Sequence, residues 1–248
     1  MVVAVCNHKG GTGKTTTALN LSCALALQNR RVMLIDFDPQ CNLTYAMGIQ
    51  EGLTTLSDVF IYNLNLSEAI VKKENVDVVI ADTTLADVEL SLQQVQGREF
   101  VLRKLLEPFK NNYDFILVDC PPSRSLLTLN ALCAADKILI PLFPEVLSLQ
   151  GLNFMMKTID EVRQVLHPGL EISGVVITNM DTRKKIAMEI ACFLSEKTNL
   201  MIYKSYIRTS ARLAEAPSHG KSIFGYDHKS TGAVDYANLA SEFLAQNI

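Results

Sequence analysis

The chain has 248 residues, of which 48% are hydrophobic and 20% charged, and its net charge is −3. These values are typical of a globular protein and exclude wholesale disorder and collagen-like structure. Because no run of about 18 apolar residues occurs and Met1–Val5 lack a basic leader, we predict neither a transmembrane helix nor a signal peptide. Six scattered cysteines without a C-x-x-C pair favour reduced thiols and a cytoplasmic protein over disulfides or a zinc site.

The charge is distributed unevenly along the chain. Residues 181–232 hold nine Lys or Arg against five Asp or Glu, so the remainder has a net charge of −7. A basic C-terminal third favours a polyanionic partner, although scattered, solvated lysines would give the same count.

Short runs rich in β-branched residues alternate with longer stretches of helical spacing. Strands are predicted at 2–6, 31–36, 76–81, 114–119, 137–141, 172–178 and 200–206. Helices are predicted at 14–28, 100–109, 123–134, 147–166, 183–197 and 231–246. Continuous apolar strands that alternate with helices indicate right-handed crossovers and a mostly parallel sheet flanked by helices, which is a three-layer, doubly wound α/β fold.

The interval 48–98 is polar and interrupted, so we expect loops and short helices over one edge of the sheet. No Gly/Ser/Pro-rich linker, internal repeat or low-complexity tract divides the chain. We therefore predict a single domain over residues 1–248, without an N-terminal helix-turn-helix domain, because the first strand already begins at residue 2.

The strongest chemical signal lies between the first strand and the first helix, where the sequence is Lys9-Gly10-Gly11-Thr12-Gly13-Lys14-Thr15-Thr16. The glycines let backbone N–H groups curve around phosphate oxygens, and the helix presents its positive end to the same anion. Lys14 is expected to reach the β- and γ-phosphates and Thr15 to hold Mg²⁺, as in a P-loop NTPase. The usual first glycine of the P-loop motif is absent, and Asn7 stands at the start of the loop.

Lys9 is a second cation in this loop, although Lys14 already serves the phosphates. One interpretation is action in trans on the nucleotide of a second protomer, in the manner of an arginine finger. The alternative is a solvated loop lysine.

Three aspartates follow predicted strands. Asp36 and Asp38 end the second strand, and Asp119 ends the apolar run 115–118 in a Walker B pattern. Carboxylates at the carboxyl ends of strands face the crevice of an open α/β sheet, where they can hold a metal or orient an attacking water. Each alone would more often be a turn or capping residue, but the three together in a P-loop chain favour catalysis.

These motifs carry a resemblance to a known family. K-G-G-T-G-K-T-T-T, D-F-D-P-Q-C-N and L-V-D-C-P-P-S resemble the deviant Walker A ATPases, which include ParA/Soj, MinD and the nitrogenase iron protein. The segment Arg212–Lys221, with Tyr226-Asp227 and Gly232-Ala233, is similar to the R-L-A-E-A-P-S-H-G-K…Y-D-P…G-A of chromosomal Soj/ParA. The resemblance runs from residue 2 to 245.

The resemblance implies a slow ATPase that uses ATP and Mg²⁺, forms a nucleotide sandwich homodimer, and binds double-stranded DNA nonspecifically on the nucleoid. A ParB/Spo0J-type partner would stimulate hydrolysis. By position, Lys9 matches the family's lysine that reaches across the dimer, and Asp38 matches its water-activating aspartate. Asp36 and Asp119 match the metal shell. Lys14 and Thr15 match the phosphate-binding and magnesium-binding positions.

The sequence also departs from the family. His8 stands where Gln is usual, and Cys41 replaces the glycine of D-P-Q-G-N. The family's I-P-R-N-V-R reads Ile207-Arg208-Thr209-Ser210-Ala211-Arg212, so the proline often placed beside the adenine is absent. Thr178 and Asn179, at the end of a predicted strand, are the substitute candidates for contacts to the base.

No DNA-reading motif is visible, so a sequence-independent contact is expected to need only cations at phosphate spacing. The candidates are Lys204, Lys221 and Lys229, with Lys184, Lys185 and Lys197 beside them. With roughly six phosphates neutralised per dimer, affinity would fall about a thousandfold between 50 and 200 mM salt.

Three alternatives stay open. A MinD-like membrane ATPase would need a basic amphipathic C-terminal helix, but no Lys or Arg follows Lys229. A reductase of the iron-protein type would need a glycine-rich cysteine loop, which does not surround Cys120. A ParA-like positioner of another cargo, such as a carboxysome or a chemoreceptor cluster, would use the same chemistry.

Overall fold

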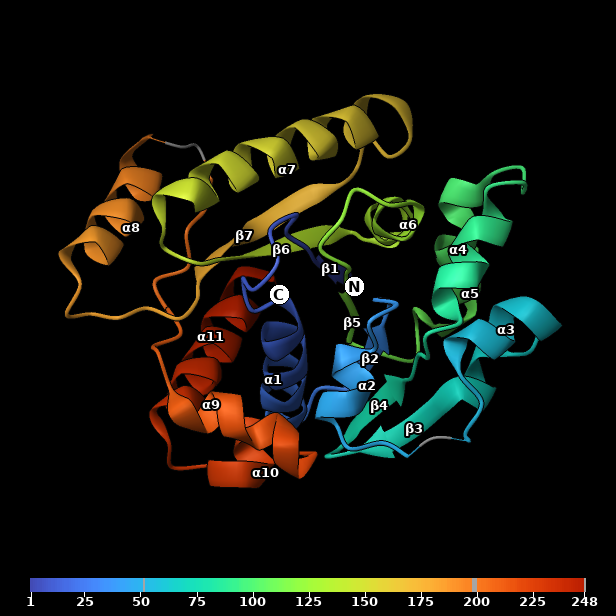
Figure 1. Cartoon of the computed structure of the whole chain (residues 1–248), viewed down its shortest axis with the longest axis horizontal. Coiled ribbons are helices and arrows are strands. Elements are labelled where there is room, and N and C mark those ends of the chain that lie inside the picture. Colours follow the sequence, from blue (N-terminus) through green and yellow to red (C-terminus); the bar gives the residue numbers. More distant parts are fainter. Residues whose placement is uncertain (51, 198–199, 248) are drawn as a thin grey trace.

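A seven-stranded sheet forms the centre of the computed structural model, which describes residues 1–50, 52–197 and 200–247 (Figure 1). The strand order is β3-β4-β2-β5-β1-β6-β7, and all neighbours are parallel except β3 and β4. The strands are β1 (Val2–Val5), β2 (Val32–Asp36), β3 (Ile70–Lys73), β4 (Val76–Val79), β5 (Phe115–Asp119), β6 (Lys137–Leu142) and β7 (Glu171–Ile177).

Helices cover both faces of this sheet. They are α1 (Lys14–Leu27), α2 (Asn42–Ala46), α3 (Leu56–Tyr62), α4 (Leu85–Leu92), α5 (Val101–Leu106), α6 (Leu126–Ala134), α7 (Val146–Val165), α8 (Lys185–Lys197), α9 (Ala211–Glu215), α10 (Ile223–Asp227) and α11 (Thr231–Asn247). Short 3₁₀ turns are η1 (Leu66–Ala69), η2 (Arg98–Phe100), η3 (Glu107–Phe109) and η4 (Ala216–His219).

Two apolar cores, one on each face, explain why the strands are apolar throughout. In β1, Val2 and Ala4 pack into the core shared with α3 to α8, whereas Val3 and Val5 pack into the core shared with α1, α2, α10 and α11. Successive strand residues point to opposite faces, so a strand covered on both sides cannot alternate with polar residues. The predicted three-layer, doubly wound α/β fold is confirmed.

The prediction of a strand at 200–206 is wrong. In the described part of this stretch, Ile202 makes only an isolated bridge to Val175. The backbone N–H groups of Lys204 and Ser205 instead donate to the Glu242 carboxylate of α11, each at 2.8 Å. Because a side chain takes these donors, they are not available to extend the sheet beyond β7.

The edge strand β3 was missed because it lies in the polar interval 48–98. It pairs antiparallel with β4 through a tight turn at Glu74 and Asn75, whose φ angles are 47° and 62°. The other predicted elements agree with the structure to within a few residues at each end. In the described ranges, no helix is both long and apolar enough to span a bilayer.

Candidate active site

The loop between β1 and α1 is shaped to receive an anion. Gly11 and Gly13 have φ angles of +72° and +82°, which any other residue would adopt only with strain. The buried Asn7 holds the start of the loop: its side chain donates to the Pro141 carbonyl at 2.8 Å and accepts from the Lys9 N–H at 3.0 Å. Asn7 thus fixes the start of the loop by hydrogen bonds.

Lys14 lies at the first turn of α1 and is only 6% exposed. Its Nζ donates to the Lys9 carbonyl at 3.3 Å. Burial lowers the pKa of Lys14, and the nearby Asp119 carboxylate acts in the opposite direction. A buried ammonium group that is held by one weak contact has much to gain from a phosphate oxygen.

Asp36 and Asp119 lie directly opposite each other at the carboxyl ends of β2 and β5. Asp36 is fully buried and accepts hydrogen bonds from the Thr44 N–H at 2.8 Å and the Thr44 hydroxyl at 2.7 Å. Burial raises the pKa of Asp36 to about 6, and the hydrogen bonds from Thr44 oppose this shift. Thr44 escaped the sequence analysis because nothing in its spacing marks it as a partner of Asp36.

Asp119 differs from Asp36 in its hydrogen bonds. Both of its carboxylate oxygens are buried, and neither accepts a hydrogen bond of standard geometry from the described residues. Burial and the charge of Asp36 raise the pKa of Asp119 well above its usual value, and the neighbouring Thr15 hydroxyl opposes this shift. Unpartnered carboxylate oxygens beside a hydroxyl fit Mg²⁺, which prefers oxygen ligands and keeps several waters.

Asp38 follows β2 and is 4% exposed. One of its oxygens accepts the Gln40 N–H at 3.0 Å, which fixes the turn into α2. Cys41, at the start of α2, has a φ of +54°, a conformation that favours glycine. The glycine that the family usually has at this position therefore has a physical reason, and Cys41 keeps the turn without it.

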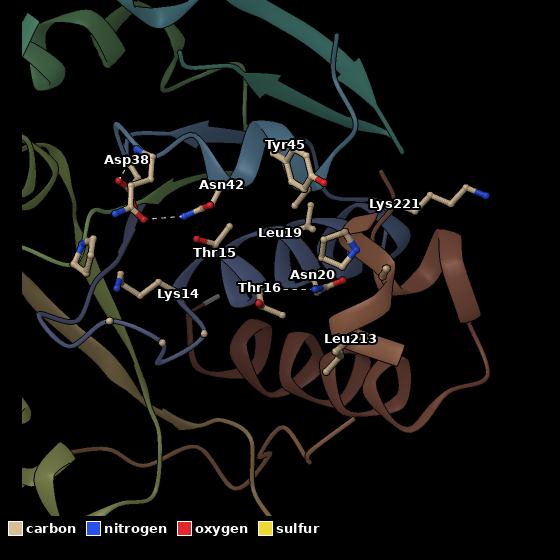
Figure 2. A pocket seen from close by; sticks show the side chains of 18 residues that line it. Lys14, Thr15, Thr16, Leu19, Asn20, Asp38, Asn42, Tyr45, Leu213 and Lys221 are labelled. Carbon is tan, nitrogen blue, oxygen red and sulfur yellow. Dashed lines mark hydrogen bonds between the residues drawn. The ribbon is translucent and has the colours of Figure 1, made fainter. Parts of the chain in front are cut away.

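A cavity of about 420 Å³ opens beside the loop (Figure 2). Of the predicted nucleotide-binding and catalytic residues, it is lined by Gly10, Gly11, Gly13, Lys14, Thr15, Thr16 and Asp38. Figure 2 shows Asp38 and Asn42 on one side of the cavity and Lys14 and Thr15 on the other. Asp36, two residues before Asp38, and Asp119, opposite Asp36 in the sheet, do not line the cavity. Both are fully buried, and with Thr15 they would hold a metal ion.

Thr178 and Asn179 border a second, smaller cavity of about 260 Å³ on the other side of the loop, together with Thr12, Ile207, Arg208 and Ser210. The Thr178 hydroxyl donates to the Thr12 carbonyl at 2.8 Å, so it supports the loop. Asn179 is exposed and has a left-handed φ of 51°. The two cavities share Gly11, Gly13 and Thr16, so they flank the same phosphate-binding turn.

Lys9 does not line either cavity. Its Nζ lies 2.9 Å from the Glu145 carboxylate and 3.1 Å from the Ser148 hydroxyl, both next to the start of α7. The side chain therefore points away from the nucleotide cavity of its own chain. Glu145 and Ser148 were not singled out as partners of Lys9 by the sequence analysis, because they lie far along the chain from it.

The predicted DNA-binding lysines Lys184, Lys185, Lys204, Lys221 and Lys229 are exposed, but they lie on different parts of the structure. Lys184 and Lys185 lie at the start of α8, whereas Lys221 and Lys229 lie on either side of α10, and Lys204 is held near α11. Figure 1 draws α8 and α10 well apart, with α9 and α11 between them. The side chain of Lys197 lies outside the described residues.

A glycine-rich loop before a helix, a buried lysine and paired acids at neighbouring strand ends define a P-loop nucleotide-binding site. A family model described as an AAA domain matches residues 1–172. The chromosome partitioning protein ParA of Caulobacter vibrioides is 42% identical over 99% of this chain and 94% of that protein. The sporulation initiation inhibitor protein Soj of Bacillus subtilis is 40% identical, covering 98% of each.

One solved structure, named cobyrinic acid a,c-diamide synthase of Mycobacterium smegmatis, contains an ATP analogue and magnesium. It is 32% identical with a TM-score of 0.86, and the match covers 98% of this chain and 93% of that one. The chain therefore belongs to the ParA/Soj family of P-loop ATPases. The predicted family, ATPase class and ligands, ATP and Mg²⁺, are confirmed.

Proposed function

We propose that this ATPase segregates DNA: two copies pair around ATP, the pair binds duplex DNA without sequence preference, and a ParB-type partner triggers hydrolysis and release. The observation that carries the proposal is the direction of Lys9. A lysine in the phosphate loop that turns away from its own cavity is suited to the nucleotide of a second copy.

The reaction is attack of water on the γ-phosphate to give ADP and phosphate. Lys14 and the N-terminal N–H groups of α1 stabilise the phosphate charge, and Asp38 orients the water from across the cavity. Thr15, Asp36 and Asp119 would hold Mg²⁺, which supplies charge neutralisation between the β- and γ-phosphates. Lys9 of the second copy adds positive charge where negative charge develops.

The ion pair between Lys9 and Glu145 must break before Lys9 can bind the nucleotide of a second copy. In a single chain the ammonium group is paired at 2.9 Å, so a second copy's phosphate must replace Glu145 as its partner. Turnover is therefore expected to be slow until two copies are aligned, which suits a switch that must persist in its ATP state.

DNA binding is proposed to rest on the exposed lysines, with Lys204, Lys221 and Lys229 as the first group. A dimer doubles the number of phosphate contacts, so ATP controls affinity for the nucleoid through pairing. The same chemistry would serve a family member that positions another cargo. The identity of the partner protein would distinguish DNA segregation from the positioning of another cargo.

Size-exclusion chromatography with ATP and Mg²⁺, with and without a duplex of arbitrary sequence, tests the proposal. We expect a dimer with ATP, a DNA-bound dimer with duplex, and a monomer with ADP. A monomer under all conditions would contradict the proposal.

A second candidate function is ATP-dependent amide synthesis, because the Mycobacterium smegmatis structure is named for that activity. The Caulobacter and Bacillus relatives, at higher identity, favour partitioning. Amidation of a cobyrinic acid by the purified chain with ATP and glutamine or ammonia would decide for the second candidate.

A further inference from the structure

The turn between β3 and β4 is fastened to the start of α10 by one carboxylate. Glu74 accepts the backbone N–H of Ser222 at 3.0 Å, and it also accepts the Ser222 hydroxyl. Gly225 of α10 packs so closely here that a Cβ at this position would lie 2.7 Å from the Glu74 carboxylate. Figure 1 shows the end of this hairpin next to α10. Two segments that lie 148 residues apart in the chain therefore share one surface.

A lysine precedes each of the two residues that form this contact. Lys73, the last residue of β3, precedes Glu74, and Lys221 precedes Ser222. Because Glu74 and Ser222 are hydrogen-bonded, the backbone of Lys73 is fixed close to that of Lys221. The charge count along residues 181–232 could not include Lys73, since only the folded chain brings the hairpin to this segment.

Strand alternation separates Lys73 from its neighbour Lys72. Successive side chains of a strand point to opposite faces of the sheet. In β3, Ile70 packs against the core shared with α3 to α8, whereas Val71 packs against the core shared with α1, α2, α10 and α11. Lys72 therefore lies on the face of Ile70, where its Nζ is 4.0 Å from the Asp77 carboxylate. Lys73 lies on the face of Val71, which is the face that α10 covers.

Lys73 and Lys221 are both available to an anion. Lys221 is exposed and Lys73 is partly exposed. In the part of the chain that the structure describes, neither ammonium group forms an ion pair. Glu74 lies between them, but its carboxylate is occupied by Ser222. Binding of a phosphate by either lysine therefore breaks no existing ion pair.

We propose that Lys73 extends the DNA-binding surface from the segment around α10 onto the β3–β4 hairpin, so that Lys73 and Lys221 neutralise phosphates of the same duplex. The inference rests on the proposed DNA binding and adds a residue from outside the basic C-terminal third. Duplex DNA is the favoured partner because its backbone carries about one charge per 1.7 Å of helix axis, so each added cation raises affinity without a shaped pocket.

The test compares two adjacent lysines of one strand in the full chain with ATP and Mg²⁺. Lys73→Glu is expected to weaken binding to a duplex of arbitrary sequence about tenfold. The slope of log affinity against log salt should fall in magnitude by about 2, because each chain of the dimer loses one phosphate contact. Lys72→Glu, the matched control, changes the net charge equally on the opposite face and should weaken binding less than about twofold. Fluorescence anisotropy measures both affinities, and ATP affinity should be normal in both variants.

Two further variants separate charge from folding. Lys73→Arg keeps the charge and should bind DNA normally. If Lys73→Glu does not fold, Lys73→Gln removes the charge without reversing it, and it should still lower the salt slope by about 2. A normal salt slope in a folded Lys73→Gln would overturn the inference.

Other outcomes identify what has failed. Equal DNA affinities of Lys73→Glu and Lys72→Glu, with weaker binding in Lys221→Glu, would overturn this inference and leave the proposed function intact. If the unaltered chain does not bind DNA with ATP, the proposed function fails first and the inference falls with it. Binding to phosphatidylglycerol vesicles that Lys73→Glu abolishes, with unchanged DNA affinity, would assign the hairpin to a membrane surface and overturn the inference.

Discussion

The phosphate loop with its three aspartates and the C-terminal segment 200–229 are held in place by different means. The first region lies at the carboxyl ends of buried parallel strands, whose register places Asp36 opposite Asp119. The second has little regular structure before α9 and depends on carboxylates that reach in from elsewhere: Glu242, Asp235 and Glu74 each accept backbone N–H groups from it. The positions of residues that a sheet register fixes can be predicted from the sequence. The positions of residues that depend on single side chains far along the chain cannot.

The first test removes Asp38, the residue proposed to orient the attacking water, and leaves the rest of the strand-end region intact. Asp38→Ala is expected to lower the rate of ATP hydrolysis about a thousandfold, because it removes the group that orients the attacking water. ATP binding should persist, and the variant should accumulate as a DNA-bound dimer. Single-turnover phosphate release and chromatography measure the two effects. A variant that stays monomeric with ATP would show that the role assigned to Asp38 is wrong.

The second test concerns ATP binding at the phosphate loop, in the same strand-end region. Lys14→Ala is expected to weaken ATP affinity by about a hundredfold, because a buried, charge-assisted contact to phosphate is lost. Lys204→Ala, an exposed lysine in the other region, serves as the control and should bind ATP normally. Isothermal titration with ATP and Mg²⁺ gives both values. Similar affinities for the two variants would mean that Lys14 does not contact the phosphates.

The third test addresses the C-terminal region. Charge reversal to Glu at Lys204, Lys221 and Lys229 is expected to weaken DNA binding at least about tenfold and to flatten its salt dependence, because each lysine neutralises phosphate charge. The same reversal at Lys104, Lys110 and Lys157, which lie on α5, just after η3 and on α7, changes the net charge equally outside this region and should have a small effect. Retained dimerisation with unchanged DNA affinity in the first variant would refute the proposed DNA surface.

The fourth test concerns Lys9, which belongs to the loop but is held by α7. Lys9→Ala should bind ATP yet fail to dimerise. Glu145→Gln frees the lysine, and dimerisation with ATP should become up to about fivefold tighter, since a partly exposed ion pair contributes up to about 1 kcal/mol. Sedimentation equilibrium over a range of protein concentrations measures this shift. Weaker pairing in Glu145→Gln would mean that the ion pair supports the dimer.

Sequence reasoning succeeded where the pattern and the physical cause are local. Three strand-end aspartates and a glycine loop imply one site because parallel strands end at one edge. It failed at Leu200–Tyr206, where Glu242 takes the N–H groups of Lys204 and Ser205, and at β3, an edge strand in a polar interval whose pairing depends on β4. It also could not find the partner of Lys9, because the Lys9–Glu145 pair forms only once α7 packs beside the loop.

The last test, with the smallest expected effect, asks whether the Glu242 carboxylate alone holds the C-terminal segment 200–229 in place. In Glu242→Gln, one of the two acceptors for the N–H groups of Lys204 and Ser205 becomes an amide donor. The free energy of unfolding should fall by about 1–2 kcal/mol, because a charge-assisted bond to a half-buried donor is lost. Chemical denaturation measures this loss, and ATP affinity should remain normal because the strand-end region does not depend on Glu242. Equal loss of stability and ATP affinity would mean that the two regions are not independent. A loss of DNA affinity alone would mean that the position of Lys204, rather than its charge, limits the contact.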